Sequence, residues 1–424
     1  MILIRAPRSY YNQDATRTES VHCNAVANLT EELIAAGGLR PLTTVTIETV
    51  TTLDGVLALK PCYEKLQQKI DNLLPFALHE WHVTWCRHFL NANPRIQDDP
   101  LFYVLRDPAG TCVAIIPFVV SRRRIGPIKV VSVNVIGSDP AITEIRSPMI
   151  APGYERVAAH AVQQHLTKAV NWDWIHWTGI SEAFADALAV TGKMQWQPTQ
   201  EDFVLDLAPS WEEFRGRLKR NIRESLRHCY NSLKRDNHVF ELSVVKDARS
   251  MRGALDRFFE LHAMRADFKT AAVHPNRFAN QAAREFLYDI CERLCAQDAV
   301  RIFQLKVGSE VVAARVGFIA RDGLYLYYSG YDPAWWRYSV MTTTVAEAIK
   351  YAIGMGLKTV NLSPNREVSK TRWGPRQVDY ITAYELGTRL RSRLARQAYI
   401  RALGGEGLPS WFLQHLIPAR RNWQ

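Results

Sequence analysis

Two similar series of hydrophobic and polar positions follow one another along this 424-residue chain. The first series opens with alternating β-branched residues, continues with apolar positions at helical spacing, and then returns to strand-like alternation. It predicts a strand, two helices, three strands, a helix and a last strand over residues 45–50, 59–76, 79–90, 101–107, 112–122, 129–137, 155–170 and 172–180. Helices followed by a meander of strands indicate an α+β fold.

The second series repeats this order from residue 202 onward. It predicts strands over 202–207, 240–246, 300–307, 310–320, 324–332, 359–363 and 378–386, and helices over 211–234, 248–268, 276–297 and 342–355. Gly308-Ser309 and Asp322-Gly323 have the chemistry of two-residue hairpin turns, which makes the strands on either side antiparallel. We therefore expect two tandem modules, divergent copies of one unit, each a mixed, mostly antiparallel sheet flanked by helices.

These patterns divide the chain into four segments. Residues 1–44 are polar and weakly patterned, which predicts a mobile tail with one short helix over 29–38. An N-terminal module covers 45–200 and a C-terminal module covers 201–388. Residues 389–424 form an arginine-rich tail with two open interpretations. It is either a solvated helix packed on the domain, or a segment that contacts an anionic membrane or a nucleic acid.

Composition and charge indicate a cytoplasmic protein with large cores. The hydrophobic fraction is 47% and the charged fraction 22%, as in ordinary globular proteins. The longest apolar run, Val113 to Val120, is far shorter than the ~20 residues of a membrane span. The net charge of +11 favours anionic partners, although many basic proteins have none, and we expect no DNA partner. Seven irregularly spaced cysteines predict neither a disulfide framework nor a metal site.

The candidate chemistry lies in the stretch LYLYYSGYDPAWWRYS, Leu324 to Ser339, because the chain has no Walker-type or dinucleotide-type glycine motif and no Gly-x-Ser-x-Gly. A tyrosine-rich strand ends at Pro333, and a helix begins near Ser339 or Thr342. A helix N-terminus offers free N–H groups and a positive dipole end, which suit a phosphate. If the strand over 359–363 diverges from the tyrosine strand, a cleft opens that can bind an extended ligand.

Several short motifs surround this cleft. They are a strand ending in Ser-Gly-Tyr-Asp-Pro, a Gly-rich helix end, a short strand ending at Ser363, and the run Lys370-Thr371-Arg372-Trp373-Gly374. As a set they resemble the GNAT-type acyltransferases. Within that family, Pro75-Phe76 and Glu80-Trp81 look most similar to the CelD-type branch of cellulose and exopolysaccharide biosynthesis, a relative of the Fem aminoacyl transferases. The resemblance spans about residues 45–388 and is strongest over 201–376.

The resemblance implies two GNAT-like modules, a degenerate first one and a second one that transfers an acyl group from acyl-CoA to an amine without a metal ion. Tyr331 would polarise the thioester carbonyl or protonate the leaving thiolate, and Asp332 would position the amine or take its proton. Lys370 would hold an acceptor phosphate or stabilise developing negative charge. The donor would lie on Tyr328, Ser329, Arg337, Ser339, Val340, Met341, Thr342 and Asn361, and the acceptor on Arg223, Arg227, His262 and Trp373.

The branch implies that the acceptor is an amino sugar, free or nucleotide-linked, in surface-polysaccharide biosynthesis. Two alternatives stay open. A Fem-like transferase that uses aminoacyl-tRNA would account for the basic charge, although the chain lacks the inserted helical pair of many Fem proteins. A non-catalytic binding protein derived from a GNAT pair is favoured by two departures from the family pattern. Val340-Met341 stand where Pro-Gly is usual, and Asn361-Leu362 stand where Asp-Phe is usual.

Overall fold

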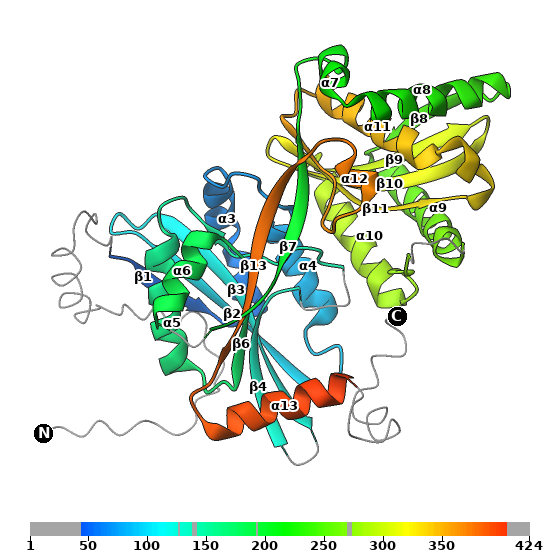
Figure 1. The fold of residues 1–424 in the computed structure, drawn as a ribbon. Helices are drawn as coiled ribbons and strands as arrows, with labels where there is room; N and C mark the ends of the chain where they lie inside the picture. The colour runs from blue at the N-terminus through cyan, green and yellow to red at the C-terminus, as the bar shows by residue number, and fades with distance from the viewer. Residues whose placement is uncertain (1–43, 126–127, 138–141, 192–193, 269–273, 405–424) are drawn as a thin grey trace, which may run out of the picture.

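A continuous mixed β-sheet runs through the molecule (Figure 1). The computed structural model describes residues 44–125, 128–137, 142–191, 194–268 and 274–404. The predicted N-terminal tail, apart from its last residue, and the tail beyond residue 404 lie outside the described residues. Within the described residues the sheet has 13 strands, in the order β1-β2-β3-β4-β6-β13-β7-β12-β11-β10-β9-β8, with β5 paired to β3. The predicted fold class is confirmed: helices flank a mixed, mostly antiparallel sheet.

The N-terminal half alternates strands and helices much as its apolar pattern predicts. Its strands are β1 (Thr46–Val50), β2 (Ile96–Arg106), β3 (Cys112–Ile125), β4 (Ile128–Val135), β5 (Met149–Ile150), β6 (Trp174–Ile180) and β7 (Met194–Asp206). Its helices are α2 (Leu53–Ala58), α3 (Lys60–Gln67), α4 (His79–Phe89), α5 (Glu155–Ala169) and α6 (Glu182–Thr191), with the 3-10 helix η1 (Pro75–Ala77).

The C-terminal half contains the tyrosine strand and the helix that follows it. Its strands are β8 (Phe240–Val245), β9 (Val300–Val307), β10 (Glu310–Ala320), β11 (Gly323–Tyr331), β12 (Thr359–Asn361) and β13 (Arg376–Leu386). Its helices are α7 (Trp211–Arg217), α8 (Arg220–Arg235), α9 (Ala248–Asp267), α10 (Gln281–Cys295), α11 (Val340–Gly354), α12 (Val368–Thr371) and α13 (Leu390–Gly404), with the 3-10 helix η2 (Pro333–Tyr338).

The strand pairing of the first half recurs in the second. In the first half β1, β2, β3 and β4 form an antiparallel meander, and β4 then pairs in parallel with β6 across the helix α5. In the second half β8, β9, β10 and β11 form the same meander, and β11 pairs in parallel with β12 across the helix α11. The recurrence of both element order and pairing supports the two-module interpretation.

The last strand of each half pairs with the other half. β7 pairs antiparallel with β12, and β13 pairs antiparallel with β6, so the two halves exchange their final strands. β7 and β13 also pair with each other and run side by side through the middle of the molecule (Figure 1). The predicted boundary between residues 200 and 201 falls inside β7.

Helices on the C-terminal half cover both faces of its sheet. α9 and α10 pack on one face. There the ring centres of Trp81 in α4 and Phe286 in α10 lie 5.1 Å apart, and this contact joins the cores of the two halves. α8 and α11 cover the other face through Ile222, Leu226 and Ile349. The predicted helix over 211–234 is interrupted, because Leu218 adopts an extended conformation with its side chain buried. α2, α6 and the first half of β7 were not predicted from the sequence.

Candidate functional site

The cleft opens where β11 and β12 separate. The two strands pair at Gly323–Tyr325 with Thr359–Asn361, and β11 then continues to Tyr331 while the chain after Asn361 turns away. Ser363 and Asn365 make this turn with positive φ angles of 70° and 75°. β11 and β12 therefore diverge, as predicted from the sequence. A cavity of about 410 Å³ lies at the divergence, between β11, the start of α11 and the segment after β12.

A bulge in β11 shapes the wall of this cleft. In the pairing with β10, Arg315 faces Ser329 and Gly317 faces Leu326, so Tyr327 and Tyr328 together oppose a single residue. Their rings consequently lie close together, with centroids 4.5 Å apart, instead of pointing to opposite faces of the sheet. Tyr327 and Tyr328 both line the cavity, and Tyr327 is the more deeply buried of the two.

The tyrosine hydroxyls of β11 hold a loop of the N-terminal half. Tyr325 donates a hydrogen bond to the carboxylate of Glu144 at 2.9 Å, and Tyr327 donates to the carbonyl of Ile142 at 2.5 Å. The amide of Gln200 also donates to the backbone carbonyl of Glu144 at 2.7 Å. These bonds fix the loop against the C-terminal half, and the side chain of Glu144 lines the cleft. They explain why a buried strand carries so many ring hydroxyls.

The same loop closes the equivalent position in the N-terminal half. Gly137, after β4, has φ 93°, and a Cβ there would lie 2.6 Å from the side chain of Thr143. Gly179, in β6, has φ 63°, and a Cβ there would lie 1.9 Å from the carbonyl oxygen of Arg146. Only glycine permits this approach. The space between β4 and β6 is therefore filled, which supports the prediction of a degenerate first module.

Glu144 and Lys370 place a carboxylate and an amine in one cavity. Burial raises the pKa of Glu144 to about 7, although the bond from Tyr325 and the charges of Lys370 and Arg315 oppose this shift. Burial also lowers the pKa of Lys370. The Lys370 ammonium donates to the carbonyl of Pro364 and lies 3.9 Å from Glu367. A carboxylate that ionises near neutral pH is suited to accept a proton from a bound amine.

Positive charge dominates the cleft. Its charged lining consists of Arg265, Arg277, Arg315, Lys370 and Arg372, with Glu144 and Glu367 as the acids. Arg265 donates to the Ser329 hydroxyl at 2.8 Å, Arg315 to the Leu326 carbonyl at 2.9 Å and Arg372 to the Thr342 hydroxyl at 2.6 Å. Among the described residues none of these three guanidinium groups forms an ion pair within 4 Å, and burial lowers the pKa of each. The site is therefore suited to an anionic ligand.

His262 is held in a single neutral form. Its Nδ1 bonds to the carbonyl of Ser329 at 2.8 Å, so this nitrogen is the donor, and its Nε2 accepts from the backbone N–H of Arg277 at 3.2 Å. Burial lowers its pKa to about 4. Gly330 allows this contact, since a Cβ there would lie 2.3 Å from the backbone nitrogen of His262. Both ring nitrogens are used, so His262 positions α9 on β11 and does not act as a base.

The structure brings part of the predicted site together. The predicted residues that line the cleft are Tyr328, Ser329, Met341, Thr342, Lys370, His262 and Trp373. The predicted residues outside its lining are Tyr331, Asp332, Arg337, Ser339, Val340, Asn361, Arg223 and Arg227.

Asp332 and Asn361 have structural partners where they lie. The carboxylate of Asp332 accepts from the backbone N–H of Ala334 at 2.9 Å and so caps η2. The amide of Asn361 donates to buried Asp202 at 2.6 Å and accepts from the backbone N–H of Ser363 at 2.7 Å, which orders the turn after β12.

Tyr331 and Arg337 lie beside the cleft on either side of the same turn. The Tyr331 ring lies 5.9 Å from the Arg265 guanidinium, which is itself in the cleft wall. Arg337 donates to the hydroxyl of Tyr338 at 2.5 Å and is exposed. Ser339, in left-handed conformation with φ 53°, precedes the first residue of α11, and the Val340 side chain is buried in the core.

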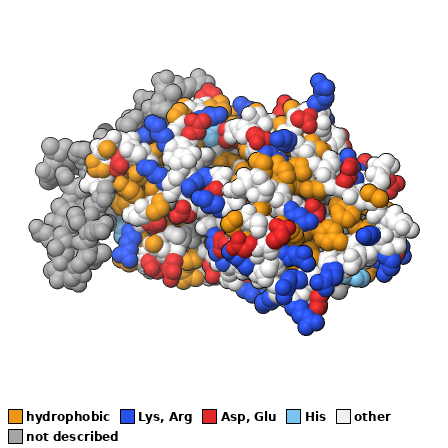
Figure 2. Space-filling model, turned by 90° about the horizontal axis from the view of Figure 1, so that it is seen from above, with side chains coloured by type: hydrophobic (Ala, Val, Ile, Leu, Met, Phe, Trp, Pro, Cys, Tyr) orange, Lys and Arg blue, Asp and Glu red, His pale blue; other side chains and the backbone are white. Residues whose placement is uncertain are grey.

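Arg223 and Arg227 lie on the solvent face of α8. Figure 2 looks down on the end of the molecule where α7 and α8 lie, and its Lys and Arg side chains are interspersed with Asp and Glu. Arg220 on the same helix pairs with Glu224 at 2.6 Å. This mixed surface has the character of a solvated helix face.

Glu144 was missed by sequence reasoning. It lies in an irregular segment between two strands of the other module, and its local sequence carries no motif. The available signal was indirect: the hydroxyls of Tyr325 and Tyr327 needed buried partners that the C-terminal module alone does not supply.

Comparison with known families finds a similarity around the C-terminal cleft. Residues 220–371 match the family model described as "Acetyltransferase (GNAT) domain". This part of the chain is therefore similar to a GNAT domain. The matched segment, called the GNAT domain below, runs from α8 to α12 and includes the diverging strands, the start of α11 and Lys370, whereas Glu144 lies outside it.

Solved structures similar to this chain have low sequence identity to it, and the first of them, FemX, shows a similar fold. FemX is 10% identical with a TM-score of 0.52, over 76% of this chain and 95% of that one. The C-terminal domain of a putative lysylphosphatidylglycerol synthetase from Agrobacterium fabrum is 11% identical with a TM-score of 0.47, over 82% and 96%. A tandem GNAT protein from the clavulanic acid pathway is 11% identical with a TM-score of 0.41, over 81% and 99%. No curated protein matches the sequence.

Proposed function

We propose that the GNAT domain, completed by Glu144 of the N-terminal half, transfers an acyl group from a thioester to an amine. The supporting observation is the position of Glu144: a carboxylate whose pKa lies near 7 lines the same cavity as Lys370, beside the diverging strands of a GNAT domain. Groups with pKa values near the working pH are effective general bases.

The proposed reaction is a direct acyl transfer accompanied by two proton transfers. The acceptor nitrogen attacks the thioester carbonyl, a C–N bond forms and the C–S bond breaks. The Glu144 carboxylate takes the proton that the amine loses, and the leaving thiolate takes a proton from solvent or from a cleft hydroxyl. Lys370 stabilises the negative charge that develops on the carbonyl oxygen or the thiolate. Of the other two predicted catalytic residues, Asp332 caps η2, and Tyr331 lies beside the cleft against Arg265.

The proposed donor is acyl-CoA. Its phosphates would lie at the start of α11, where Arg372 and Thr342 line the cleft and the helix presents its first N–H groups. The Val340 side chain, which stands where proline is usual, is buried in the core and does not fill this space. Met341, which stands where glycine is usual, lines the cleft, so the donor phosphates would lie against its side chain.

The proposed acceptor is an amino sugar, free or nucleotide-linked, as the CelD-type resemblance implies. Arg265 and Arg277 line the side of the cleft formed by α9 and the segment after it, opposite α11. They would pair with a phosphate or carboxylate on the acceptor, because no acid of the described residues pairs with them. A pathway of surface-polysaccharide synthesis supplies acceptors of this chemistry.

The Fem-like alternative, with aminoacyl-tRNA as donor, is favoured by one observation. The carbonyl of Ser329 already accepts from His262 at 2.8 Å and from Arg265 at 3.4 Å. That carbonyl belongs to the part of β11 beyond its pairing with β12, so less backbone is free for the extended arm of a CoA thioester.

The proposal is tested by acetyl-CoA and longer acyl-CoA binding in a calorimeter, together with acyl transfer to a panel of amino sugars. We expect micromolar binding, about −8 kcal/mol, and turnover that falls at least ~100-fold in Glu144→Gln with donor affinity unchanged. Glu367→Gln, at the other acid of the cleft, is the matched control and should keep turnover within a few-fold. Binding of acyl-CoA without turnover, in the unmodified chain and in the variants, would favour a non-catalytic role. Tighter binding of aminoacyl-tRNA than of uncharged tRNA would favour the Fem-like alternative.

A further inference from the structure

The helix α13 lies across the outer end of the N-terminal half (Figure 1). Its inner face is fixed to the sheet: Ala395 is buried against Val130 and Trp174, and Tyr399 lies 5.1 Å from the Trp174 ring. Arg391 pairs with buried Asp173 at 3.3 Å. The helix therefore belongs to the folded domain, and its other face looks away from the sheet.

The outer face of α13 combines apolar and basic side chains. Leu390 is 74% exposed and Leu394 56% exposed, and at a spacing of four residues they lie on one face. Arg389 and Arg393 directly precede them, and residues 388–404 contain no acid. Large exposed apolar side chains on a helix flanked by cations are typical of helices that lie in a membrane interface.

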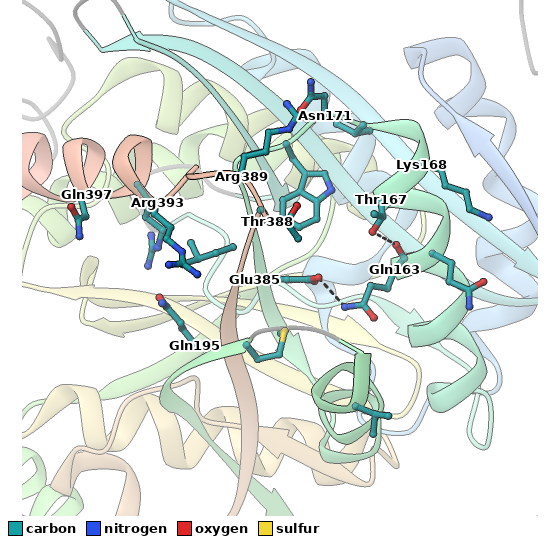
Figure 3. Close-up of a pocket in the computed structure, with 18 residues that line it drawn as sticks. Gln163, Thr167, Lys168, Asn171, Gln195, Glu385, Thr388, Arg389, Arg393 and Gln397 are labelled. Atoms are coloured by element: carbon teal, nitrogen blue, oxygen red, sulfur yellow. Dashed lines mark hydrogen bonds between the residues drawn. The ribbon is translucent and has the colours of Figure 1, made fainter. Parts of the chain in front are cut away.

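A broad groove of about 1390 Å³ adjoins this face. Figure 3 shows it between α13 and α5. Arg393 and Gln397 of α13 line it together with Arg389, which directly precedes this helix, and α5 contributes Gln163, Thr167 and Lys168. Its charged lining is four cations, Lys168, Arg389, Arg393 and Arg396, and one acid, Glu385.

Two buried groups, Glu385 and Arg396, suit the groove to an anion. Both carboxylate oxygens of Glu385 are already bonded, to the Gln163 amide at 2.9 Å and to the Trp177 indole at 3.2 Å, so this acid does not pair with the arginines. Arg396 is 9% exposed, and its Nε has no hydrogen-bond partner within the described part of the chain. The Arg396 guanidinium lies over the Tyr384 ring, 3.7 Å from its centre, and no acid among the described residues pairs with it, which favours an anion that enters the groove.

The end of β3 and the start of β4 extend this surface. The Arg123 guanidinium lies 5.0 Å from the ring centre of Tyr399, so the hairpin touches α13. At these ends of the strands, Arg124 and Lys129 are exposed, and Ile128 is 38% exposed. The cations and apolar side chains of two elements thus gather at one end of the molecule.

We propose that this end of the molecule, formed by α13, the groove beside it and the described ends of β3 and β4, docks on an anionic lipid bilayer. Leu390 and Leu394 enter the boundary between head groups and acyl chains, Arg389 and Arg393 contact lipid phosphates, and the groove receives a head group. None of the helices in the described residues is long and apolar enough to cross a membrane, so the contact is with its surface. The proposal is independent of the acyl-transfer chemistry.

A lipid surface fits this end of the molecule better than a nucleic acid does. Nucleic-acid surfaces place aromatic side chains for base stacking among their cations. On α13 the described aromatic side chain, Tyr399, packs on Trp174 instead, and the large exposed apolar side chains are leucines.

The test is co-sedimentation of the full chain with vesicles of phosphatidylcholine alone or mixed with phosphatidylglycerol. We expect at least ten-fold stronger binding to the anionic vesicles, weakened by salt, and a loss of at least ten-fold in both Leu390→Ser/Leu394→Ser and Arg389→Gln/Arg393→Gln. The matched controls are Val239→Ser/Met355→Ser, at apolar side chains exposed elsewhere, and Arg223→Gln/Arg227→Gln on α8. They should bind as the unmodified chain does, and circular dichroism should show every variant folded.

Three outcomes would overturn the proposal. The first is equal binding to neutral and anionic vesicles, or to neither. The second is unchanged binding in the leucine variant, which would leave an electrostatic contact without insertion. The third is equally tight binding of a 20-nucleotide RNA that the arginine pair alone abolishes, which would assign the face to a nucleic acid. Acyl transfer to a soluble acceptor, measured on the same variants, stays unchanged and separates this proposal from the proposed function.

Discussion

Removal of one ring hydroxyl from β11 should move the pH dependence of catalysis. Tyr325 donates to the Glu144 carboxylate at 2.9 Å, and this bond lowers the pKa of Glu144 against the larger effect of burial. In Tyr325→Phe the carboxylate loses that donor, while the protonated acid loses less. The pKa of Glu144 therefore rises above its value of about 7, and the base is ionised only at higher pH.

The size of the effect follows from the two kinds of hydrogen bond. A bond to a charged acceptor contributes about 1.5–3 kcal/mol and one between neutral groups about 0.5–1.5 kcal/mol. The difference of about 1.5 kcal/mol corresponds to about one pKa unit. The acid limb of kcat/KM should therefore move from about pH 7 to about pH 8, with an activity loss of about ten-fold at pH 6.5 and a small loss at pH 9.

The assay is kcat/KM against pH with an arylamine acceptor, which stays unprotonated across the range, so that the limb reports the enzyme. Tyr327→Phe is the matched control, because Tyr327 is also a buried hydroxyl of β11 and bonds the same loop, but at a carbonyl that does not titrate. It should cost similar stability and leave the limb in place. A limb that stays at the same pH in Tyr325→Phe, or that moves equally in Tyr327→Phe, would refute the role of Glu144 as base.

Three further predictions concern stability and the predicted site. Gly330→Ala should destabilise the fold by about 2–3 kcal/mol in urea titrations, because its Cβ would meet the α9 backbone at 2.3 Å and no side chain can yield there; full stability would show that α9 shifts freely. Burial raises the pKa of Asp202 to about 6, so the unfolded chain releases its proton first and stability falls as pH rises from about 4 to 6. Asp202→Asn should remove that fall, up to about 3 kcal/mol above pH 6, and parallel stability curves for the two proteins would contradict it. Asp332→Ala should cost about 1 kcal/mol through loss of the η2 cap and keep kcat within a few-fold; a loss of turnover at full stability would restore its predicted catalytic role.

The fold was predictable wherever the apolar residues of a segment repeat at the spacing of a strand or a helix. The meander β9–β10–β11 has alternating apolar positions and two hairpin turns, and its bounds agree closely with the prediction. The first half of β7 was missed because MQWQPTQE is polar and contains a proline. Its strand conformation depends on pairing with β13 from residue 376 onward, which no local pattern contains.

The backbone elements around the candidate site were predictable from the sequence, whereas the proposed base was not. The diverging strands, the helix that starts at Val340 and the position of Lys370 follow from short segments close together in sequence. The carboxylate that faces Lys370 comes from residue 144, more than two hundred residues earlier, and reaches the cleft because tyrosine hydroxyls capture its loop. Asp332 is the N-cap of η2 in the structure, and an Asp before Pro is also an ordinary turn residue, so its sequence did not distinguish a structural role from a catalytic one.

The exchange of final strands makes the order of synthesis matter. Ile180 of β6 pairs with Ile381 of β13, so the edge of the first half has no partner until the ribosome has made the whole segment that matches the GNAT family model, residues 220–371. During that interval β6 presents unpaired N–H and C=O groups, the kind of edge that recruits other chains. Division of the gene between residues 200 and 201 would cut β7 in two and place β6 and its neighbour β13 on separate products. The two halves are therefore a single unit of folding and inheritance, and neither can be gained, lost or replaced in evolution without the last strand of the other.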